Sequence, residues 1–139
     1  PMDDPERRAF LSAGTRTGKL ATVRRDARPH VQPVWFVLDG DDLLFMTGAA
    51  TVKGRNLRRD PRVSLVVDDE APPFSFVRVD GRVALSEDLE QMREWSTRIA
   101  RRYMGSELAE GFGARNAVPG ELLVRLTPSH TVSEAGVAD

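Results

Sequence analysis

The strongest constraint on the fold is a series of six short runs rich in β-branched and aromatic residues, most of them bounded by turn residues. We expect strands over residues 19–23, 30–38, 43–47, 63–67, 77–85 and 122–126. Asp39-Gly40, between the second and third runs, is a typical hairpin turn. Short strands joined by short turns favour antiparallel pairing. The pattern predicts a mainly β (α+β) fold, a six-stranded antiparallel barrel, closed or partly closed, with peripheral helices.

Helical patterns occur in three segments outside these runs. Residues 5–13 form a short opening helix, and residues 88–104 carry apolar side chains at helical spacing. Thr51 can cap a third helix, which must stop before Pro61 because a proline disfavours helical backbone in the preceding residue. The glycine-rich segment 105–120 is expected to be a loop or a broken helix.

Length and charge limit the classes of protein to consider. A chain of 139 residues suits one domain with one core, taken as residues 1–139, with Pro1 interpreted as a remnant of tag cleavage. A net charge of -1 argues against nucleic acid or an anionic membrane surface as the main partner. No apolar run is long enough to span a bilayer and no signal-peptide pattern opens the sequence. We therefore expect a cytoplasmic protein.

The common catalytic and metal-binding motifs are missing from the sequence. There is no cysteine, so the chain has neither a thiol nucleophile nor a thiolate metal site. His30 and His130 are the only histidines, and neither has carboxylates at ligand spacing, so no metal site is expected. The segment 111–116 begins like a dinucleotide loop, but Asn116 replaces the final glycine and no strand precedes it. We assign no catalytic residue.

The segment 51–65, TVKGRNLRRDPRVSL, is the motif that most indicates a ligand. Free amides at a helix start attract phosphate, and Lys53 and Arg55 add positive charge nearby. The alternative is a solvated basic connecting helix. Arg58, Arg59 and Arg62 extend the charge along the same broad face as Arg55, either to follow an anionic tail or as a face exposed to solvent.

Several of these segments resemble a known superfamily. Residues 18–23 and 28–36 resemble the first two strands of the split β-barrel flavin-binding proteins, the superfamily named for pyridoxamine 5′-phosphate oxidase. The segment 51–65 is similar to the phosphate-binding turn and helix of its actinobacterial branch, whose members use the deazaflavin coenzyme F₄₂₀, and residues 79–83 fit the next strand. An arginine-rich, lysine-poor composition also suits an actinobacterial genome. The resemblance spans residues 4 to 132 and implies an FMN-binding split-barrel fold.

The resemblance also implies a homodimer with two cofactor sites at its interface. Independently, residues 63–67 look apolar enough to be buried on both faces, which favours a partner surface. The ring would lie against the strand that contains Trp35, for which a buried core position is the alternative. The turn at Thr51 would surround the ribityl chain and phosphate, and Lys53 would hold the phosphate. The expected cofactor-binding residues are Gln32, Pro33, Val34, Trp35, Phe36, Thr47, Gly48, Thr51, Lys53, Arg55 and Asn56.

The activity implied by the resemblance is an F₄₂₀-dependent reductase. It would transfer a hydride from the reduced coenzyme to an electron-poor double bond of a small acceptor such as biliverdin, a quinone or an unsaturated lactone. A deazaflavin has carbon in place of the reactive ring nitrogen of a flavin, which favours hydride transfer and disfavours reaction with oxygen. Two alternatives stay open: an FMN-binding oxidase or flavin reductase, and a cofactor-binding protein without its own chemistry.

Overall fold

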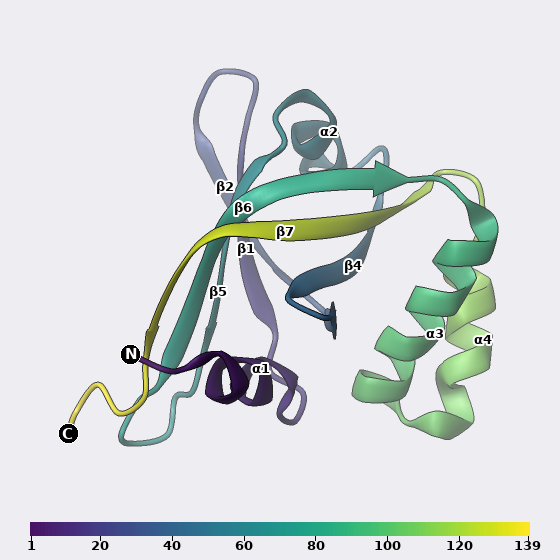
Figure 1. Cartoon of the computed structure of the whole chain (residues 1–139). Coiled ribbons are helices and arrows are strands. Elements are labelled where there is room, and N and C mark those ends of the chain that lie inside the picture. The colour runs from purple at the N-terminus through teal and green to yellow at the C-terminus, as the bar shows by residue number, and fades with distance from the viewer.

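Seven strands form one antiparallel sheet with the order β2-β1-β5-β6-β7-β4-β3, accompanied by four helices (Figure 1). The computed structural model describes residues 1–139. The strands are β1 (Gly18–Val23), β2 (Pro29–Val34), β3 (Val37–Asp39), β4 (Asp42–Gly48), β5 (Arg62–Asp68), β6 (Phe76–Ser86) and β7 (Glu121–Glu134). The helices are α1 (Asp4–Ser12), α2 (Val52–Arg59), α3 (Leu89–Met104) and α4 (Ser106–Asn116). The prediction of a mainly β, antiparallel fold with peripheral helices is confirmed.

The predicted number of six strands is wrong, because the run 30–38 divides into two strands. β2 ends at Val34 and pairs with β1, whereas β3 begins at Val37 and pairs with β4 at the opposite edge of the sheet. Phe36, between them, has no strand partner: its N–H donates to the Tyr103 hydroxyl at 3.3 Å, and its carbonyl accepts from Arg102 at 2.7 Å. Side chains of α3 thus satisfy the backbone groups that a continuous strand would have paired.

The same break makes the sheet curl. Val34 and Val37 are three residues apart, so their Cα atoms lie within about 11 Å of each other. The two edges of the sheet therefore approach one another at this point. β2 and β3 do not pair with each other, so the ladder stays open and no closed barrel forms.

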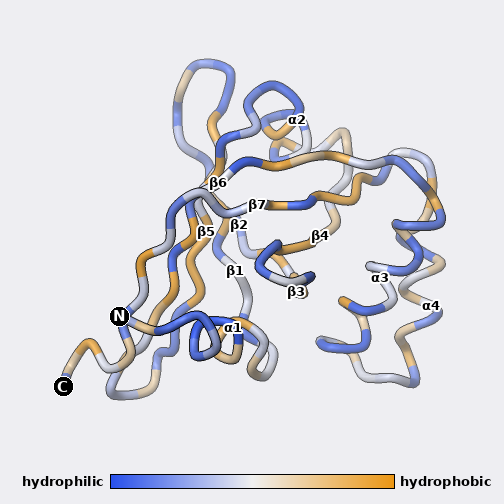
Figure 2. Tube along the Cα trace, in the orientation of Figure 1, coloured by the Kyte–Doolittle hydropathy of each residue, from blue (hydrophilic) through white to orange (hydrophobic).

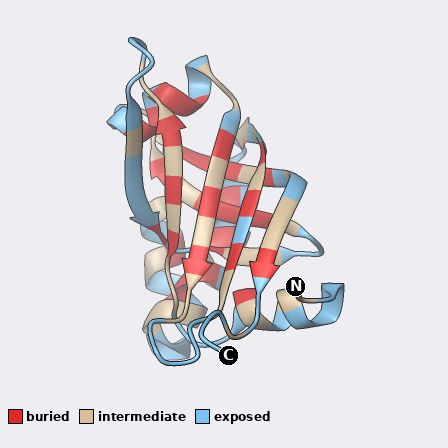
Figure 3. Cartoon of the chain, turned by 90° about the vertical axis from the view of Figure 1, so that its left-hand side faces the viewer, coloured by how far each residue is buried: buried red, intermediate tan, exposed pale blue.

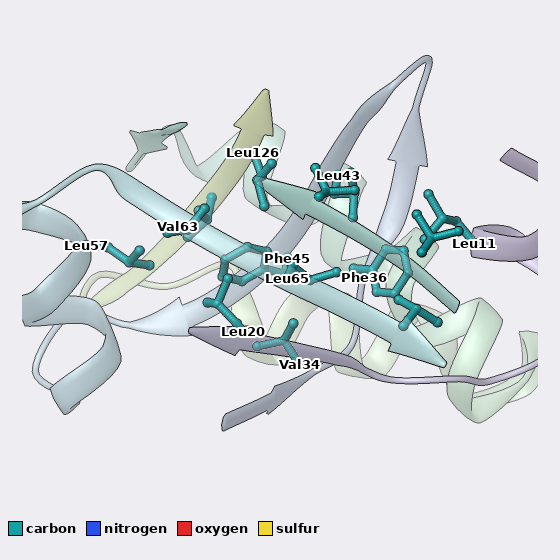
Figure 4. Packing of buried hydrophobic residues seen from close by; sticks show 14 residues of the cluster. Leu11, Leu20, Val34, Phe36, Leu43, Phe45, Leu57, Val63, Leu65 and Leu126 are labelled. Carbon is teal, nitrogen blue, oxygen red and sulfur yellow. The ribbon is translucent and has the colours of Figure 1, made fainter. Parts of the chain in front are cut away.

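The core fills the inside of this curl, where side chains from successive strands converge (Figure 4). Buried and less buried residues alternate along the strands (Figure 3), as expected for a sheet with one face on the core. On β5, Leu65 is fully buried, whereas Ser64 and Val66 on the other face are only partly covered. The prediction that residues 63–67 are buried on both faces is therefore wrong for the single chain.

Three of the four helices were predicted from the sequence, and the fourth was not. The opening helix, the capped helix after Thr51 and the amphipathic helix are confirmed as α1, α2 and α3. The segment predicted as a loop or broken helix is instead the helix α4. Its Gly113 packs against Thr97 of α3, where a Cβ would collide with the Thr97 side chain. Of the four helices, none has the length and apolarity needed to cross a membrane.

Candidate functional site

A cavity of about 410 Å³ lies between the curled sheet and the paired helices α3 and α4, here called the central cavity. Its volume is within the range typical of small-molecule sites. Segments distant in the sequence form its walls: the ends of β2 and β4, the start of α2, both long helices and the start of β7. The lining residues are Pro33, Val34, Trp35, Met46, Thr47, Gly48, Thr51, Lys53, Ser96, Ile99, Ala100, Phe112, Asn116 and Glu121.

Most of the predicted cofactor-binding residues meet in this cavity. Those that line it are Pro33, Val34, Trp35, Thr47, Gly48, Thr51 and Lys53. Four others lie elsewhere. Gln32 is exposed on the edge strand β2, Phe36 is fully buried in the core, and Arg55 and Asn56 lie on another side of α2.

Asn56 is bonded within the protein. Its side chain is 3% exposed, and its Nδ2 donates to the hydroxyl of Thr22 on β1 at 3.0 Å. Its Oδ1 accepts a hydrogen bond from Arg59 at 2.8 Å. Both ends of the amide are therefore occupied, and the contact with Thr22 fastens α2 to the sheet.

A threonine-rich turn joins β4 to α2 at one end of the cavity. The Thr51 hydroxyl accepts from the Gly54 amide at 3.0 Å and donates to the Gly48 carbonyl at 2.7 Å. The Thr47 hydroxyl lies 3.3 Å from that of Thr51. Gly54 has no room for a side chain, because a Cβ would collide with the Gly48 carbonyl. The start of α2, whose first amides lack intrahelical acceptors, is thereby held against the turn.

Lys53 projects from the first turn of α2 into the central cavity. It is 9% exposed, and its ammonium has neither a hydrogen bond nor an ion pair within the protein. Burial lowers the pKa of Lys53, and the negative charge of Glu121 opposes that shift. A largely buried cation without a partner is costly, so this arrangement is suited to receiving an anion.

The aromatic wall of the cavity comes from the break between β2 and β3. Trp35 is 43% exposed and stacks on Tyr103 of α3, with the ring centroids 5.0 Å apart. The Tyr103 hydroxyl donates to the Arg16 carbonyl at 2.8 Å, and burial raises its pKa. Trp35 is thus neither a core residue nor free to turn, and it offers a fixed surface at the edge of the cavity.

Helices α3 and α4 supply cavity residues that the sequence did not single out. Ser96 donates to the Met92 carbonyl at 2.6 Å and to the Gly113 carbonyl at 3.0 Å, which ties the two helices together. Phe112 and Asn116 are four residues apart and therefore share one face of α4. That spacing was the available signal, but it is informative only once the segment is known to be helical.

A separate basic groove lies between α2 and the β1–β2 hairpin, two hydrophilic segments that approach each other in Figure 2. It is lined by Arg24, Arg25, Asp26, Arg28, Val52, Arg55, Asn56, Arg58 and Arg59. Some of its arginines are engaged: Arg58 pairs with Glu87 at 3.0 Å, and Arg59 donates to the Val23 carbonyl at 2.9 Å. Arg55 has no ion pair. Arg62 lies outside the groove and pairs with Asp60 at 2.8 Å.

Comparison with known proteins gives one family and a set of similar structures. Residues 3–132 match the family described as pyridoxamine 5′-phosphate oxidase. A conserved hypothetical protein from Mycobacterium tuberculosis is 29% identical, with a TM-score of 0.83 over 96% of this chain and 84% of that one. An F₄₂₀ reductase is 26% identical, with a TM-score of 0.72 over 89% and 94% of the two chains. A heme storage protein from Vibrio cholerae, 24% identical with a TM-score of 0.76 over 97% of each chain, shares the fold.

Proposed function

The chain belongs to the pyridoxamine 5′-phosphate oxidase family, and we propose that it is a reductase dependent on the deazaflavin coenzyme F₄₂₀. The similarity to an F₄₂₀ reductase supports the proposal. The observation that carries it is the position of positive charge on two sides of α2: Lys53 lines the central cavity, and Arg55 lines the basic groove. F₄₂₀ bears a phosphate and then a lactyl-glutamyl tail, so it presents anionic groups at two separate places.

The residues of the cavity fit a cofactor of this kind. Lys53 offers a partly dehydrated ammonium and Thr47 a hydroxyl to the phosphate, beside the free amides at the start of α2. Trp35 and the apolar part of the lining offer a wall to the ring. Arg55 and its neighbours in the basic groove offer charge to the carboxylates of the tail.

Catalysis in this proposal depends mainly on positioning. When bound, the reduced coenzyme supplies a hydride for an electron-poor double bond of a small organic acceptor of the biliverdin, quinone or unsaturated-lactone type. The chain holds the ring against Trp35, anchors the phosphate at Lys53 and keeps water from the apolar part of the cavity.

We also propose that two copies of the chain assemble and complete each other's sites. Val31 on the edge strand β2 is 68% exposed, and Trp35, directly after the end of that strand, is 43% exposed. Trp35 also lines the central cavity, so a second copy seated on this face would cover the apolar strip and one side of the cavity together.

An FMN-binding oxidase or flavin reductase is the second candidate. The observation that favours it is the set of phosphate-binding groups, here called the phosphate grip, which consists of Lys53, Thr47 and the first amides of α2. These groups suit a phosphate whether or not a tail follows it. A binding protein without its own chemistry would use the same grip. Turnover of an acceptor panel with reduced F₄₂₀ separates that last possibility from a reductase.

Tryptophan fluorescence tests whether the cofactor occupies the central cavity. The chain has two tryptophans, of which Trp35 lines the cavity and Trp95 is buried in a separate cluster with Met92. We expect F₄₂₀ to quench the wild type and Trp95→Phe to a similar extent, and to quench Trp35→Phe much less. Equal quenching of the two variants would place the cofactor elsewhere.

A further inference from the structure

Only two side chains of the central cavity carry a charge, Lys53 and Glu121, and their formal charges cancel. We propose that Glu121 makes this cavity selective for a phosphodiester, which carries one negative charge, over a phosphomonoester, which carries close to two. This inference rests on the proposed function, because the phosphate of F₄₂₀ is a diester whereas that of FMN is a monoester. Glu121 thereby becomes a specificity-determining residue.

The backbone fixes Glu121 beside the phosphate grip. It is the first residue of β7 and stands opposite Gly48 in the ladder with β4. A hydrogen bond of 2.8 Å from the Ala49 amide to the Gly120 carbonyl closes the adjoining turns. The carboxylate therefore borders the same turn from which Thr51 caps α2. No cation forms an ion pair with Glu121, so its charge acts on whatever enters the cavity.

Lys53 and Glu121 act on a bound phosphate in opposite directions. Lys53 attracts it, and Glu121 supports the charged form of Lys53 against the effect of burial. A monoanion at this place is balanced by the lysine, and one negative charge is left over from Glu121. A dianion brings a further negative charge into a partly dehydrated space, where charges interact more strongly than in water. The cavity thus penalises the second charge of a monoester.

The arginines do not offset this second charge by contact. They line the basic groove, which shares no residue with the central cavity. Within one chain, a phosphate held by Lys53 therefore has no guanidinium among the residues that line the cavity, and in the proposed function it is the tail of the longer ligand that meets Arg55 in the groove. The charges of the protein therefore suit a ligand with a singly charged phosphate in the cavity and several carboxylates further along, at the groove.

The protonation of FMN supplies an internal control. The second pKa of a phosphomonoester is about 6, so FMN is close to a dianion at pH 8 and close to a monoanion at pH 5. A phosphodiester keeps one charge at both values. If Glu121 discriminates by charge, its removal raises FMN affinity more at pH 8 than at pH 5, whereas its effect on F₄₂₀ is the same at both values.

The test compares wild type with Glu121→Gln, titrated with F₄₂₀ and with FMN at pH 8 and pH 5 and followed by intrinsic tryptophan fluorescence. Glu110→Gln is the matched control, since it removes the same charge from an exposed site on α4 outside the cavity. At pH 8 we expect Glu121→Gln to raise the ratio of FMN to F₄₂₀ affinity by about tenfold. At pH 5, and in Glu110→Gln at either pH, the ratio should change by less than about threefold.

Three other results bear on charge selection by Glu121. An unchanged ratio at pH 8, or an equal rise at both pH values, overturns the inference. If wild type does not bind F₄₂₀, the proposed function fails, and the FMN titrations alone decide: a gain in FMN affinity in Glu121→Gln that is clearly larger at pH 8 than at pH 5 supports charge selection, and an equal gain at both values or no gain overturns it. Melting curves of each variant establish that it is folded, and Glu121→Ala repeats the test if the glutamine variant is not.

Discussion

Trp35 and Tyr103 stack with their ring planes 2° from parallel, which joins the break between β2 and β3 to the far end of α3. The Tyr103 hydroxyl adds two hydrogen bonds on the same side, to the amide of Phe36 and the carbonyl of Arg16. The wall of the central cavity is therefore held by a helix that begins more than fifty residues later in the chain. Its rigidity depends on Tyr103.

Two substitutions separate the ring of Tyr103 from its hydroxyl. Tyr103→Phe keeps the stacking but leaves the Phe36 amide unpaired, so we expect a loss of about 1–3 kcal/mol in the free energy of unfolding. Tyr103→Ala also removes the ring, and we expect a loss of about 3–5 kcal/mol and weaker F₄₂₀ binding. Urea unfolding and cofactor titration measure the two effects, and equal stability of the two variants would contradict the account of the wall.

Lys53→Ala should weaken F₄₂₀ binding by roughly ten- to a hundredfold, because it removes a charge-assisted contact of about 1.5–3 kcal/mol. The melting temperature of the cofactor-free protein should not fall, because the ammonium of Lys53 has no partner within the protein to lose and its burial is unfavourable. Lys19→Ala is the matched control, since Lys19 is the other lysine and pairs with Asp68 at 3.0 Å away from the cavity. Unchanged affinity in Lys53→Ala would remove the phosphate-site assignment.

The lowered pKa of Lys53 predicts a pH dependence of stability. Between the folded pKa and the unfolded value of about 10.4, the unfolded chain binds more protons, so stability rises with pH. Below the folded pKa both states are protonated, and the full cost of the buried charge is present. We therefore expect wild type to gain stability relative to Lys53→Met as the pH is raised from neutral toward 10. Parallel pH profiles of the two proteins in urea unfolding would contradict a depressed pKa.

Affinity for F₄₂₀ should fall over the same alkaline range in which Lys53 loses its proton. A bound anion raises the pKa of Lys53, so the fall in affinity should begin at the pKa of the cofactor-free protein, where its gain in stability also begins, and continue up to the higher pKa of the complex. Titrations with F₄₂₀ between neutral pH and pH 10 measure this fall, and a constant affinity over that range would contradict it.

Arg55→Ala tests the role of the basic groove. Arg55 lines the groove without an ion pair, so its loss should weaken F₄₂₀ binding by about three- to tenfold and leave FMN binding unchanged. Arg62→Ala removes the same charge from a residue already paired with Asp60 outside the groove, and it should have no effect on either ligand. Equal losses for both ligands in Arg55→Ala would show that the groove does not read the tail.

Val31→Lys tests the proposed dimer. Val31 is largely exposed in the single chain, so the charge should not unfold it, but it should disrupt an apolar interface. Light scattering should give twice the chain mass of 15.4 kDa for wild type and a single mass for the variant. Val137→Lys, at an exposed position near the C-terminal end, should remain a dimer. A monomeric wild type at micromolar concentration would exclude the proposed assembly.

Local patterns in the sequence were enough to predict most of the sheet, the cap at Thr51 and the helix that follows it. Three features required contacts between distant residues. β2 ends where Phe36 bonds to side chains of α3, α4 packs closely on α3 where Gly113 meets Thr97, and Glu121 is placed at the cavity by its register with Gly48. Asn56 shows the opposite kind of error: its place in the basic motif predicted a cofactor contact, but its side chain is bonded to Thr22 of the sheet.

Calorimetric titration of the wild-type protein with F₄₂₀ and FMN at two salt concentrations tests most directly whether the site binds F₄₂₀ in preference to FMN. We expect F₄₂₀ to bind in the low micromolar range or tighter and FMN at least about tenfold more weakly. Because F₄₂₀ has charges in both the cavity and the groove, added salt should reduce its affinity more than that of FMN. Comparable affinities with the same salt dependence would contradict this preference and make the FMN-binding oxidase or flavin reductase the leading candidate.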